Sequence, residues 1–348
     1  MKIENFGIFP KIFFNLMNIK LVIQDFFKYN SKIKSNTYHL EKSIKWLIHA
    51  KQISKDDGVS KSYSIFEGWG TSYIETSGYI LKTFCDYYEF SRNKYFLKMC
   101  KEIADWETSI QLPSGGYRGG VISESNPPGI FNTSQVLLGL IWAFNELKNQ
   151  KYLDVAIKAG NFIVANQDND GAWRKYCYIN CPTTFNVRTA WALLELSRAT
   201  NDEKYKKAAI KNLDWALTQM NELHWFYNND TVDVNNPLLH LISYTIRGFL
   251  ESGMILNNEK YIQTAYKTSL RLLNYYEKFG WLPARFNYRW VGRANYRCLT
   301  GEAQLSICWL KLYKLTREEK FLRNAIDLNN SLKSKQIISK KWADIDGA

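Results

Sequence analysis

Side chains able to act as acids or bases stand at the starts of predicted helices that are otherwise apolar. A buried helix start carries polar side chains mainly where it lines a cavity or where the side chain caps the helix. Gln135, Arg188 and Glu302 stand two or more residues into their helices, where capping is the weaker explanation. The sequence therefore predicts one polar cavity where these starts meet, with five candidate catalytic residues: Tyr73, Glu75, His240, Tyr244 and Glu302.

Two kinds of chemistry fit these residues, and binding alone is a third alternative. Glu75 and Glu302 fit a general acid and base, because glycoside hydrolysis uses two carboxyl groups beside one bond. Tyr73, His240 or Tyr244 could instead remove a proton next to a sugar carboxylate, which is lyase or epimerase chemistry. In the third alternative none of them is catalytic and the protein binds a glycan during its assembly. The residue types favour an enzyme over a binding protein.

The candidate substrate-binding residues indicate an acidic sugar. Several arginines stand in predicted long loops or near apolar helix starts, whereas the lysines lie mostly on amphipathic helices. A guanidinium group is a planar fork that matches a carboxylate, and an indole ring stacks on the apolar face of a sugar. We expect these residues to bind substrate: Trp69, Arg118, Gln135, Arg174, Asn186, Arg188, Arg247 and Gln304.

A long repeat predicts the elements that position these side chains. A lysine–aromatic pair opens five amphipathic helices, at Lys94, Lys151, Lys204, Lys260 and Lys320. Each amphipathic helix is followed by a long loop, a helix that is apolar nearly all round, and a short turn. The predicted outer helices span 38–53, 94–111, 150–167, 203–219, 259–278 and 319–335. The predicted inner helices span 73–90, 133–147, 186–199, 239–255 and 300–315.

This alternation predicts an all-α fold, an (α/α)6 toroid of helical hairpins over residues 38–348. All long loops then lie at one end of the ring, which is where function is expected. Every inner helix starts at that end, and its partially positive N-terminus favours an anionic ligand. By this count the last inner helix is missing. We interpret the sequence as a fragment that ends before it; in the alternative, another element such as an N-terminal helix closes the ring.

Residues 1–37 form a separate N-terminal segment. Ile12, Leu16, Ile19, Ile23 and Phe26 make an apolar stripe at helical spacing, and the charged residues among them argue against a membrane span. We expect an amphipathic helix packed on the outside of the ring. The alternative is a helix lying on an anionic membrane surface, which would give peripheral membrane contact.

Composition excludes several other classes of protein. The chain has 46% hydrophobic residues, a net charge of +13 and six cysteines. The cysteines do not form a disulfide pattern, and Cys177 and Cys181 lack nearby partners for a zinc site, so we expect no metal, no cofactor and a cytoplasmic location. The lysines are spread over the predicted outer helices, and the sequence contains no recognised nucleic-acid-binding motif. We therefore do not expect a nucleic-acid partner. The oligomeric state cannot be predicted.

Two resemblances support a toroid. Residues 158–163, Gln167 and residues 171–173 are similar to the QW repeat of squalene-hopene cyclase-type proteins, but the Asp-x-Asp-Asp motif of those cyclases is absent. Residues 57–60, 68–69, 72–79, 133–136, 186–195 and 299–304 resemble bacterial α/α-toroid proteins associated with exopolysaccharide biosynthesis. Their distant relatives are six-hairpin glycosidases, toroid polysaccharide lyases and glucuronyl C5-epimerases. The resemblance implies a carbohydrate context, without a defined reaction. Together with the placement of the arginines, it leads us to expect action on a uronate-containing polysaccharide or its precursor, in surface polysaccharide biosynthesis.

Overall fold

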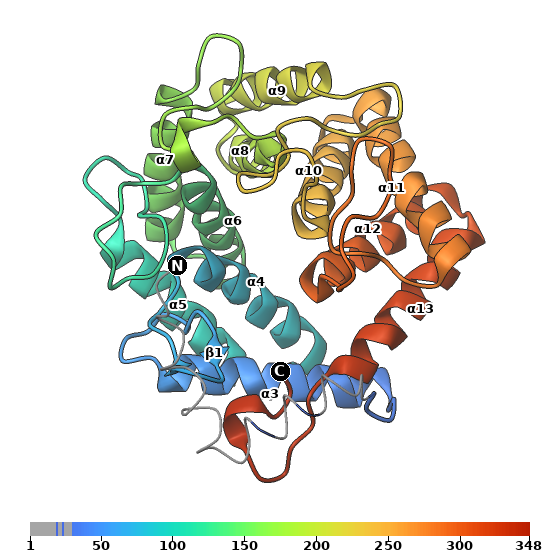
Figure 1. Cartoon of the computed structure of the whole chain (residues 1–348). Helices are drawn as coiled ribbons and strands as arrows, with labels where there is room; N and C mark the ends of the chain where they lie inside the picture. The colour runs from blue at the N-terminus through green and yellow to red at the C-terminus, as the bar shows by residue number, and fades with distance from the viewer. Residues whose placement is uncertain (1–18, 20–22, 24–29) are drawn as a thin grey trace, which may run out of the picture.

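The computed structural model describes Ile19, Ile23 and residues 30–348, and it shows two concentric rings of helices (Figure 1). The outer helices are α3 (Asn36–Ile53), α5 (Tyr95–Ile110), α7 (Gln150–Ala165), α9 (Glu203–Thr218), α11 (Glu259–Phe279) and α13 (Glu319–Lys335). The inner helices are α4 (Ile74–Ser91), α6 (Ile130–Leu147), α8 (Val187–Thr200), α10 (Leu239–Leu256) and α12 (Leu299–Thr316). The predicted α/α toroid is confirmed, with five inner helices in the described part of the chain.

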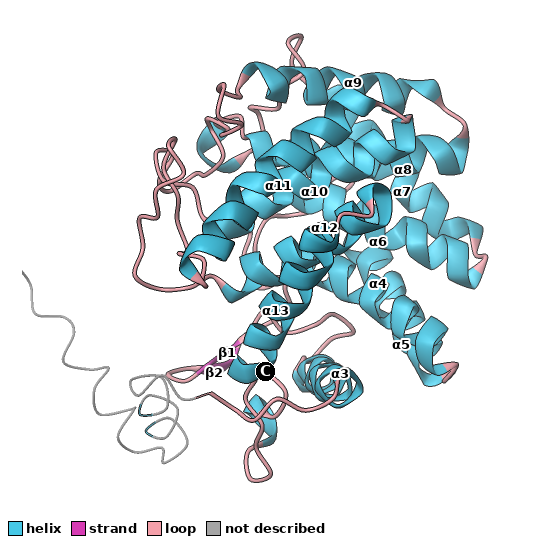
Figure 2. Cartoon of the chain, turned by 90° about the vertical axis from the view of Figure 1, so that its right-hand side faces the viewer, coloured by secondary structure: helices cyan, strands magenta, loops and turns pink. Residues whose placement is uncertain are grey.

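Short turns follow the inner helices because of the residues at the helix ends. Each inner helix ends in a residue with left-handed backbone, as Asn201 does after α8. The next outer helix often begins at a capping side chain: Asp202 accepts a hydrogen bond from the Lys204 amide, and Asn149 and Asn258 do the same for α7 and α11. The short turns therefore lie on one side of the molecule and the long loops on the other (Figure 2).

Few other elements are regular. A two-stranded antiparallel sheet, β1 (Tyr63–Ser64) and β2 (Gly68–Trp69), lies in the loop between α3 and α4. Within residues 30–348, three short 3₁₀ helices also lie outside the α-helices: η2 (Tyr178–Asn180), η3 (Thr184–Asn186) and η4 (Ala343–Ile345). Most of the irregular backbone thus lies in the long loops, so these loops can form the walls of a site.

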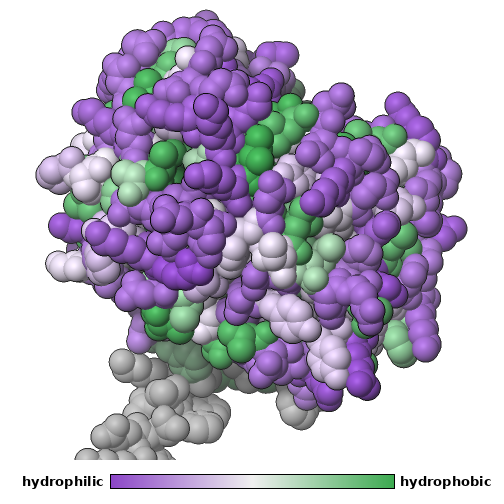
Figure 3. All heavy atoms as spheres, turned by 90° about the horizontal axis from the view of Figure 1, so that it is seen from above, coloured by the Kyte–Doolittle hydropathy of each residue, from purple (hydrophilic) through white to green (hydrophobic). Residues whose placement is uncertain are grey.

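The core lies between the two rings. Inner-helix residues such as Leu137, Leu193 and Phe249 and outer-helix residues such as Tyr152 and Leu272 are fully buried. On the α9 side, the outer surface is mainly hydrophilic, with smaller hydrophobic patches (Figure 3). In the part of the chain that the structure describes, no helix has the length and apolar character needed to cross a membrane.

Glutamine side chains tie neighbouring outer helices together. Gln111 at the end of α5 donates to the Val155 carbonyl in α7, and Gln167 at the end of α7 donates to the Ala208 carbonyl in α9. Gln336 at the end of α13 donates to the His39 carbonyl in α3. The same contact thus closes the outer ring between its last and first helices.

The N-terminal prediction concerns residues that are mostly not described. Ile19 and Ile23 are helical, whereas Ile12, Leu16 and Phe26 lie outside the described residues. The proposed membrane contact and the boundary at residue 37 therefore stay predictions.

Candidate active site

A cavity of about 810 Å³ opens where two long loops meet the starts of α4 and α6. One loop precedes α6 and the other precedes α8, so the cavity is at the long-loop end of the ring, where function was expected. Its walls include Tyr73, Glu75, Phe131, Asn132, Tyr176, Phe185 and Asn186. Among the described residues that line it, Glu75 carries the sole carboxyl group.

A close approach of α4 and α6 brings the Glu75 carboxyl to its partners. A methyl group on Gly139 would lie 2.7 Å from the Gly78 carbonyl oxygen, which is closer than real side chains come. Two glycines are therefore needed at this crossing. The resulting contact lets the Asn132 side chain of α6 donate to Glu75 Oε2 at 2.8 Å. The start of α4 is held in turn by the Tyr73 amide, which donates to the Val59 carbonyl at 2.9 Å.

Burial sets the protonation of Glu75. Desolvation raises the pKa of this carboxyl to about 7, although a hydrogen bond from Tyr79 and the charge of Arg188 both act to lower it. The Tyr79 hydroxyl donates to Glu75 Oε1 at 3.2 Å, from one helical turn further along α4. Glu75 thus exchanges a proton near neutral pH, which is the property of a general acid or base.

Behind Glu75, a buried cation is held by side chains from four inner helices. Arg188, 7% exposed, donates to Gln135 Oε1 through Nε and Nη2 at 3.2 and 3.1 Å, and to Gln304 Oε1 through Nη1 at 3.2 Å. Its guanidinium carbon lies 4.3 Å from the Tyr244 ring centre and 5.2 Å from that of Tyr79. Within the described residues, no ion pair joins Arg188 to a carboxylate, so its charge is left for a ligand or for Glu75.

His240 and Tyr244 complete this network on α10. The two rings are 4.2 Å apart between centres, and the Tyr244 and Tyr79 hydroxyls are 3.2 Å apart. Burial, with a smaller effect of Arg188, lowers the pKa of His240 to about 4, so the imidazole is neutral at pH 7. Burial raises the pKa of Tyr244, and it raises the pKa of Tyr73 at the cavity wall to about 12. Both phenols are therefore hydrogen-bond donors at neutral pH.

Other predicted site residues are paired elsewhere. Glu302 is fully buried against Arg297 and is not among the cavity-lining residues. The structure therefore does not bring it together with Glu75 as the predicted carboxyl pair. Arg247 pairs with Glu251, which Lys311 also contacts at 2.9 Å.

The remaining predicted residues lie in the loops. Arg174 pairs with Asp168 and Asp170 of its own loop, at 2.8 Å each. Trp69 donates to Asp344 at 2.7 Å and packs on the Trp46 ring, so it joins β2 to the end of the chain. Arg118 directly precedes the cavity-lining Gly119. Asn186 lines the cavity and donates to Cys177 Sγ at 3.5 Å.

Some members of the site were not selected from the sequence. Tyr79 links Glu75 to Tyr244, and Phe131 stacks on the Tyr244 ring with 5.4 Å between centres. Tyr79 stands four residues after Glu75, a spacing that places both on one helix face and could have identified it. Phe131 belongs to a helix start that the prediction placed at residue 133, and α6 begins at Ile130. In residues 30–348, no cluster of three or more His, Cys, Asp or Glu side chains could hold a metal.

Several solved structures share the fold of this chain. The solved structure of an unsaturated glucuronyl hydrolase specific for heparin has a TM-score of 0.70 at 14% identity, over 87% of this chain and 85% of its own. The cellobiose 2-epimerase from Bacillus thermoamylovorans B4167 has a TM-score of 0.68 at 15% identity, over 89% and 90%. The GH76 α-mannanase BT2949 from Bacteroides thetaiotaomicron has a TM-score of 0.61 at 16% identity, over 86% and 83%. At such identities the likeness shows the fold.

The family follows from the sequence match. No curated protein matches the chain significantly. The profile described as the beta-L-arabinofuranosidase, GH127 catalytic domain, matches residues 23–269, which include every cavity-lining residue named above. The match covers most of the chain, and its fold is one found in glycoside hydrolases and sugar epimerases. This chain belongs to the family of the GH127 beta-L-arabinofuranosidase catalytic domain.

Proposed function

We propose that this protein is a glycoside hydrolase in which Glu75 is the general acid. The observation that carries the proposal is a carboxyl group at the cavity wall whose pKa, about 7, keeps much of it protonated at neutral pH. Protonation of the glycosidic oxygen by Glu75 would let the aglycone leave as an alcohol while the bond from that oxygen to the anomeric carbon breaks; water would then add to the anomeric carbon and lose a proton, which releases the free sugar. The Asn132 and Tyr79 hydrogen bonds hold the carboxyl in one orientation and stabilise the carboxylate that remains after proton transfer. Family membership supports this reaction class.

The substrate in this proposal carries a carboxylate on the sugar that is cleaved. A buried guanidinium without a carboxylate partner favours an anion nearby, since the pairing offsets the cost of burying a charge. Gln135 and Gln304 fix the Arg188 side chain, and two of its five N–H donors remain outside the hydrogen bonds described. Arg188 is not itself a wall of the cavity, so the sugar carboxylate would approach it past the Glu75 and Tyr79 side chains. The glucuronyl hydrolase that shares the fold supports a uronate.

Proton abstraction is a second candidate, favoured by one specific observation. His240 is neutral at pH 7, contacts Tyr244 and lies near Arg188, which lowers its pKa. A neutral imidazole beside a cation suits removal of a proton next to a sugar carboxylate, because the cation stabilises the negative charge that develops. This is the reaction of an epimerase or a lyase. A role in surface polysaccharide biosynthesis, with or without catalysis, is kept as a further proposal from the sequence.

One experiment separates these alternatives. An aryl β-glucuronide, an aryl β-L-arabinofuranoside and unsaturated and saturated uronate oligosaccharides are incubated with the protein in heavy water and followed by proton NMR. We expect release of the uronate as a free sugar, lost in Glu75→Gln and retained in Glu302→Gln, which removes a buried carboxyl that does not line the cavity. Deuterium at C5 that depends on His240 would overturn hydrolysis in favour of epimerase or lyase chemistry.

The remaining outcomes test the substrate and the enzyme activity separately. Cleavage of the arabinofuranoside alone would refute the acidic substrate and leave the role of Glu75 standing. Arg188→Met should weaken uronate binding by about tenfold or more, since a charge-assisted hydrogen bond contributes about 1.5–3 kcal/mol. Line broadening of the oligosaccharides without any turnover would refute the enzyme and leave a glycan-binding protein.

A further inference from the structure

The loop before α8 forms the outer part of the cavity beside Glu75. Of the large apolar side chains in the described cavity wall, Tyr178 and Ile179 are the two that are exposed, at 67% and 64%. Glu75 in the same wall is only partly exposed. The carboxyl group therefore belongs to the inner part of the cavity, and these two apolar side chains stand at its mouth.

The backbone at this mouth is a tight turn that contains an unfavourable residue. The Cys181 amide donates to the Tyr178 carbonyl at 3.2 Å, and Ile179 and Asn180 between them both have a φ of 51°. Positive φ at both central positions is the type I′ pattern, in which glycine, asparagine and aspartate dominate. Asn180 fits this pattern, whereas a β-branched residue such as Ile179 is an outlier with this backbone. Strain of this kind persists where the surrounding structure imposes it, and it clusters at ligand-binding sites.

Contacts on both sides of the turn hold it in place. Before the turn, the buried Trp173 donates to a carbonyl of α7 at 3.0 Å, and the Tyr176 carbonyl accepts from the first amide of α6 at 3.0 Å. After the turn, the Thr184 amide donates to a carbonyl in the loop after α9 at 3.0 Å. Because the loop is attached at both ends, Tyr178 and Ile179 are kept at the mouth of the cavity.

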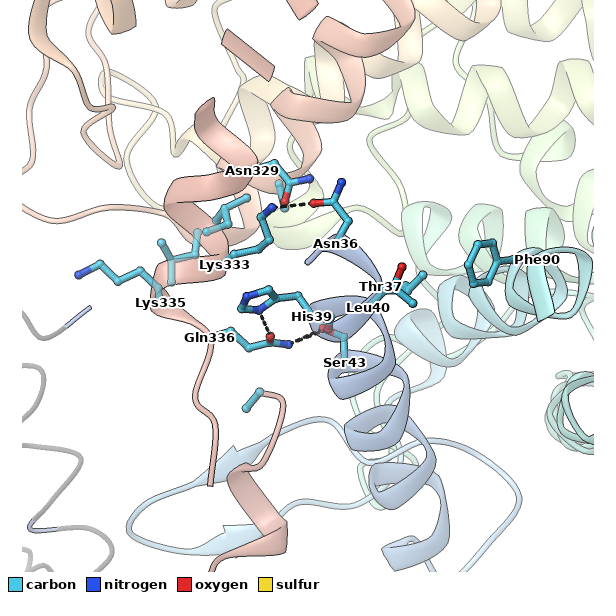
Figure 4. Close-up of a pocket in the computed structure, with 14 residues that line it drawn as sticks. Asn36, Thr37, His39, Leu40, Ser43, Phe90, Asn329, Lys333, Lys335 and Gln336 are labelled. Carbon is cyan, nitrogen blue, oxygen red and sulfur yellow. Dashed lines mark hydrogen bonds between the residues drawn. The ribbon is translucent and has the colours of Figure 1, made fainter. Parts of the chain in front are cut away.

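The polar side chains of a second hollow bind one another. This hollow of about 640 Å³ lies among α3, α12 and α13 (Figure 4). In it, His39 Nδ1 and Gln336 Oε1 are 2.5 Å apart, and Gln336 also donates to Ser43 Oγ at 2.8 Å. Lys333 donates to Asn36 at 2.6 Å. These contacts join the two ends of the outer ring, whereas the cavity beside Glu75 combines a carboxyl group with exposed apolar side chains, so we place the ligand in that cavity.

We propose that Tyr178 and Ile179 bind the leaving group of the substrate, and that this leaving group is a neutral pyranose ring. The inference rests on the proposed function, in which the cleaved sugar extends its carboxylate past Glu75 toward Arg188. The other side of the glycosidic oxygen then extends away from Arg188, toward the mouth of the cavity. The leaving group thus meets the two exposed apolar side chains of the turn.

The chemistry and size of the cavity favour a neutral sugar ring. A phenol ring beside a branched apolar side chain offers a surface on which the apolar face of a pyranose stacks. Besides Glu75, the described cavity wall has one charged side chain, Lys175, whose Nζ lies 4.8 Å from the centre of the Tyr176 ring. A charged leaving group would lose water without gaining a partner of its own, which is unfavourable. The cavity volume of about 810 Å³ lies within the roughly 300–1,000 Å³ of sites for drug-sized ligands, and a disaccharide is a ligand of that size.

Two substrates that differ only in the leaving group test the proposal. A β-linked glucuronyl–glucose disaccharide releases glucose, and methyl β-glucuronide releases methanol. We expect Tyr178→Ala to lower kcat/KM for the disaccharide by about tenfold and to change that for methyl glucuronide by less than about twofold, whereas Tyr178→Phe keeps the ring and retains both activities. Tyr288→Ala is the matched control, because Tyr288 is 45% exposed and does not line the cavity. Equal loss with both substrates, or no loss with either, would overturn the proposal.

Ile179→Gly separates the loss of a contact from a loss of stability. Glycine adopts a positive φ without strain, so this variant should unfold at no lower urea concentration than the native protein. We expect kcat/KM for the disaccharide to fall by about threefold or more, since an apolar contact is lost, and kcat/KM for methyl glucuronide to stay the same. An unchanged preference for the disaccharide would overturn the role of Ile179.

A binding measurement distinguishes failure of this inference from failure of the proposed function. Methyl β-glucoside, a neutral ring without a uronate, is titrated into protein that is isotopically labelled in its tyrosine rings and followed by NMR. The Tyr178 signal is the one missing from Tyr178→Phe, and we expect it to shift with added glucoside while the Tyr288 signal does not. A shift at Tyr178 without cleavage of either glucuronide would refute the proposed hydrolysis and support the sugar-binding turn. No shift at Tyr178 would overturn the inference, whether or not the glucuronides are cleaved.

Discussion

Removing the Tyr79 hydroxyl should raise the pKa of Glu75 and move the activity of the enzyme to higher pH. In the native site this hydroxyl donates to Glu75 Oε1 at 3.2 Å and lowers the pKa of the carboxyl, because it stabilises the charged form. A hydrogen bond to a charged group contributes about 1.5 kcal/mol at the lower end of its range, which suits a bond of this length. Since one pKa unit corresponds to about 1.4 kcal/mol, Tyr79→Phe should move the midpoint from about 7 to about 8.

Two titrations measure this shift. The first follows the carboxyl carbon of Glu75 by NMR in protein labelled at glutamate, so it needs no substrate. The second is the pH dependence of kcat/KM, which reports ionisations of the free enzyme. A general acid works in its protonated form, so activity is lost as pH rises through the pKa, and the alkaline limb should move up together with the NMR midpoint.

A matched control and a defined failure complete the test. Tyr152→Phe removes a hydroxyl that donates to Asp105 between outer helices at 2.8 Å, so it should leave the Glu75 midpoint unchanged. An unchanged or lowered midpoint in Tyr79→Phe would refute the electrostatic reasoning. A raised midpoint with activity shifted in the opposite sense would show that Glu75 acts in its ionised form, as a base.

Three further predictions concern stability. Folding raises the pKa of Glu75 from 4.5 to about 7, so the protonated carboxyl contributes to the free energy of unfolding fully below pH 4.5, and this contribution is lost as pH rises through 7. Glu75→Gln should therefore be more stable than the native protein at pH 8.5, by up to about 3 kcal/mol. Urea unfolding at both pH values should show that this difference vanishes at pH 4.5. Glu302→Gln should lower the free energy of unfolding by about 2–3 kcal/mol, because Arg297 loses the carboxylate of a fully buried partner. Loss of turnover in the folded variant would contradict a purely structural role for Glu302. Gly139→Ala should lower the free energy of unfolding by about 1–3 kcal/mol and lower kcat/KM, because the added methyl separates α4 from α6. Gly70→Ala is the control: its added methyl would lie 3.6 Å from the nearest atom, so it should change neither quantity. Equal unfolding midpoints in the two variants would refute the argument that the helix crossing needs glycine.

The ring could be predicted from the sequence because its information is local and repeated. The lysine–aromatic openings, the apolar inner helices and the alternation of short and long connections each follow from spacing along the chain. That alternation also places all inner-helix starts at one end, which is why Glu75, Arg188 and Tyr244 could be expected to share a region; in the structure Tyr79 contacts both Glu75 and Tyr244, and Arg188 lies over the Tyr244 ring. Element boundaries were less accurate: α6 begins at Ile130, three residues before its predicted start.

Side-chain pairing could be predicted only where the partner is near in sequence. Arg174 with Asp170 and Arg247 with Glu251 are four residues apart, so a check for local ion pairs would have shown that these arginines already have carboxylate partners. The partner of Trp69 is Asp344, which the sequence separates by most of the chain. No spacing rule reaches that far, because the contact exists only after the outer ring has closed.

The gap in the inner ring between α4 and α12 and the candidate site involve the same two helices. Glu75 is on α4 and Gln304 is on α12, and these two helices are the inner neighbours that no comparable packing contact joins within the described residues, unlike α4 with α6 or α10 with α12. Arg188, which hydrogen-bonds Gln304 and lowers the pKa of Glu75, therefore connects the two sides of the opening through the centre of the ring. Its placement depends on α12, which has no inner neighbour among the described helices on its side toward α4, and on α6, which packs on α4 and α8. The position of Arg188, and with it the pKa of Glu75, therefore depends on one helix that has inner neighbours on both sides and on one that has an inner neighbour on a single side.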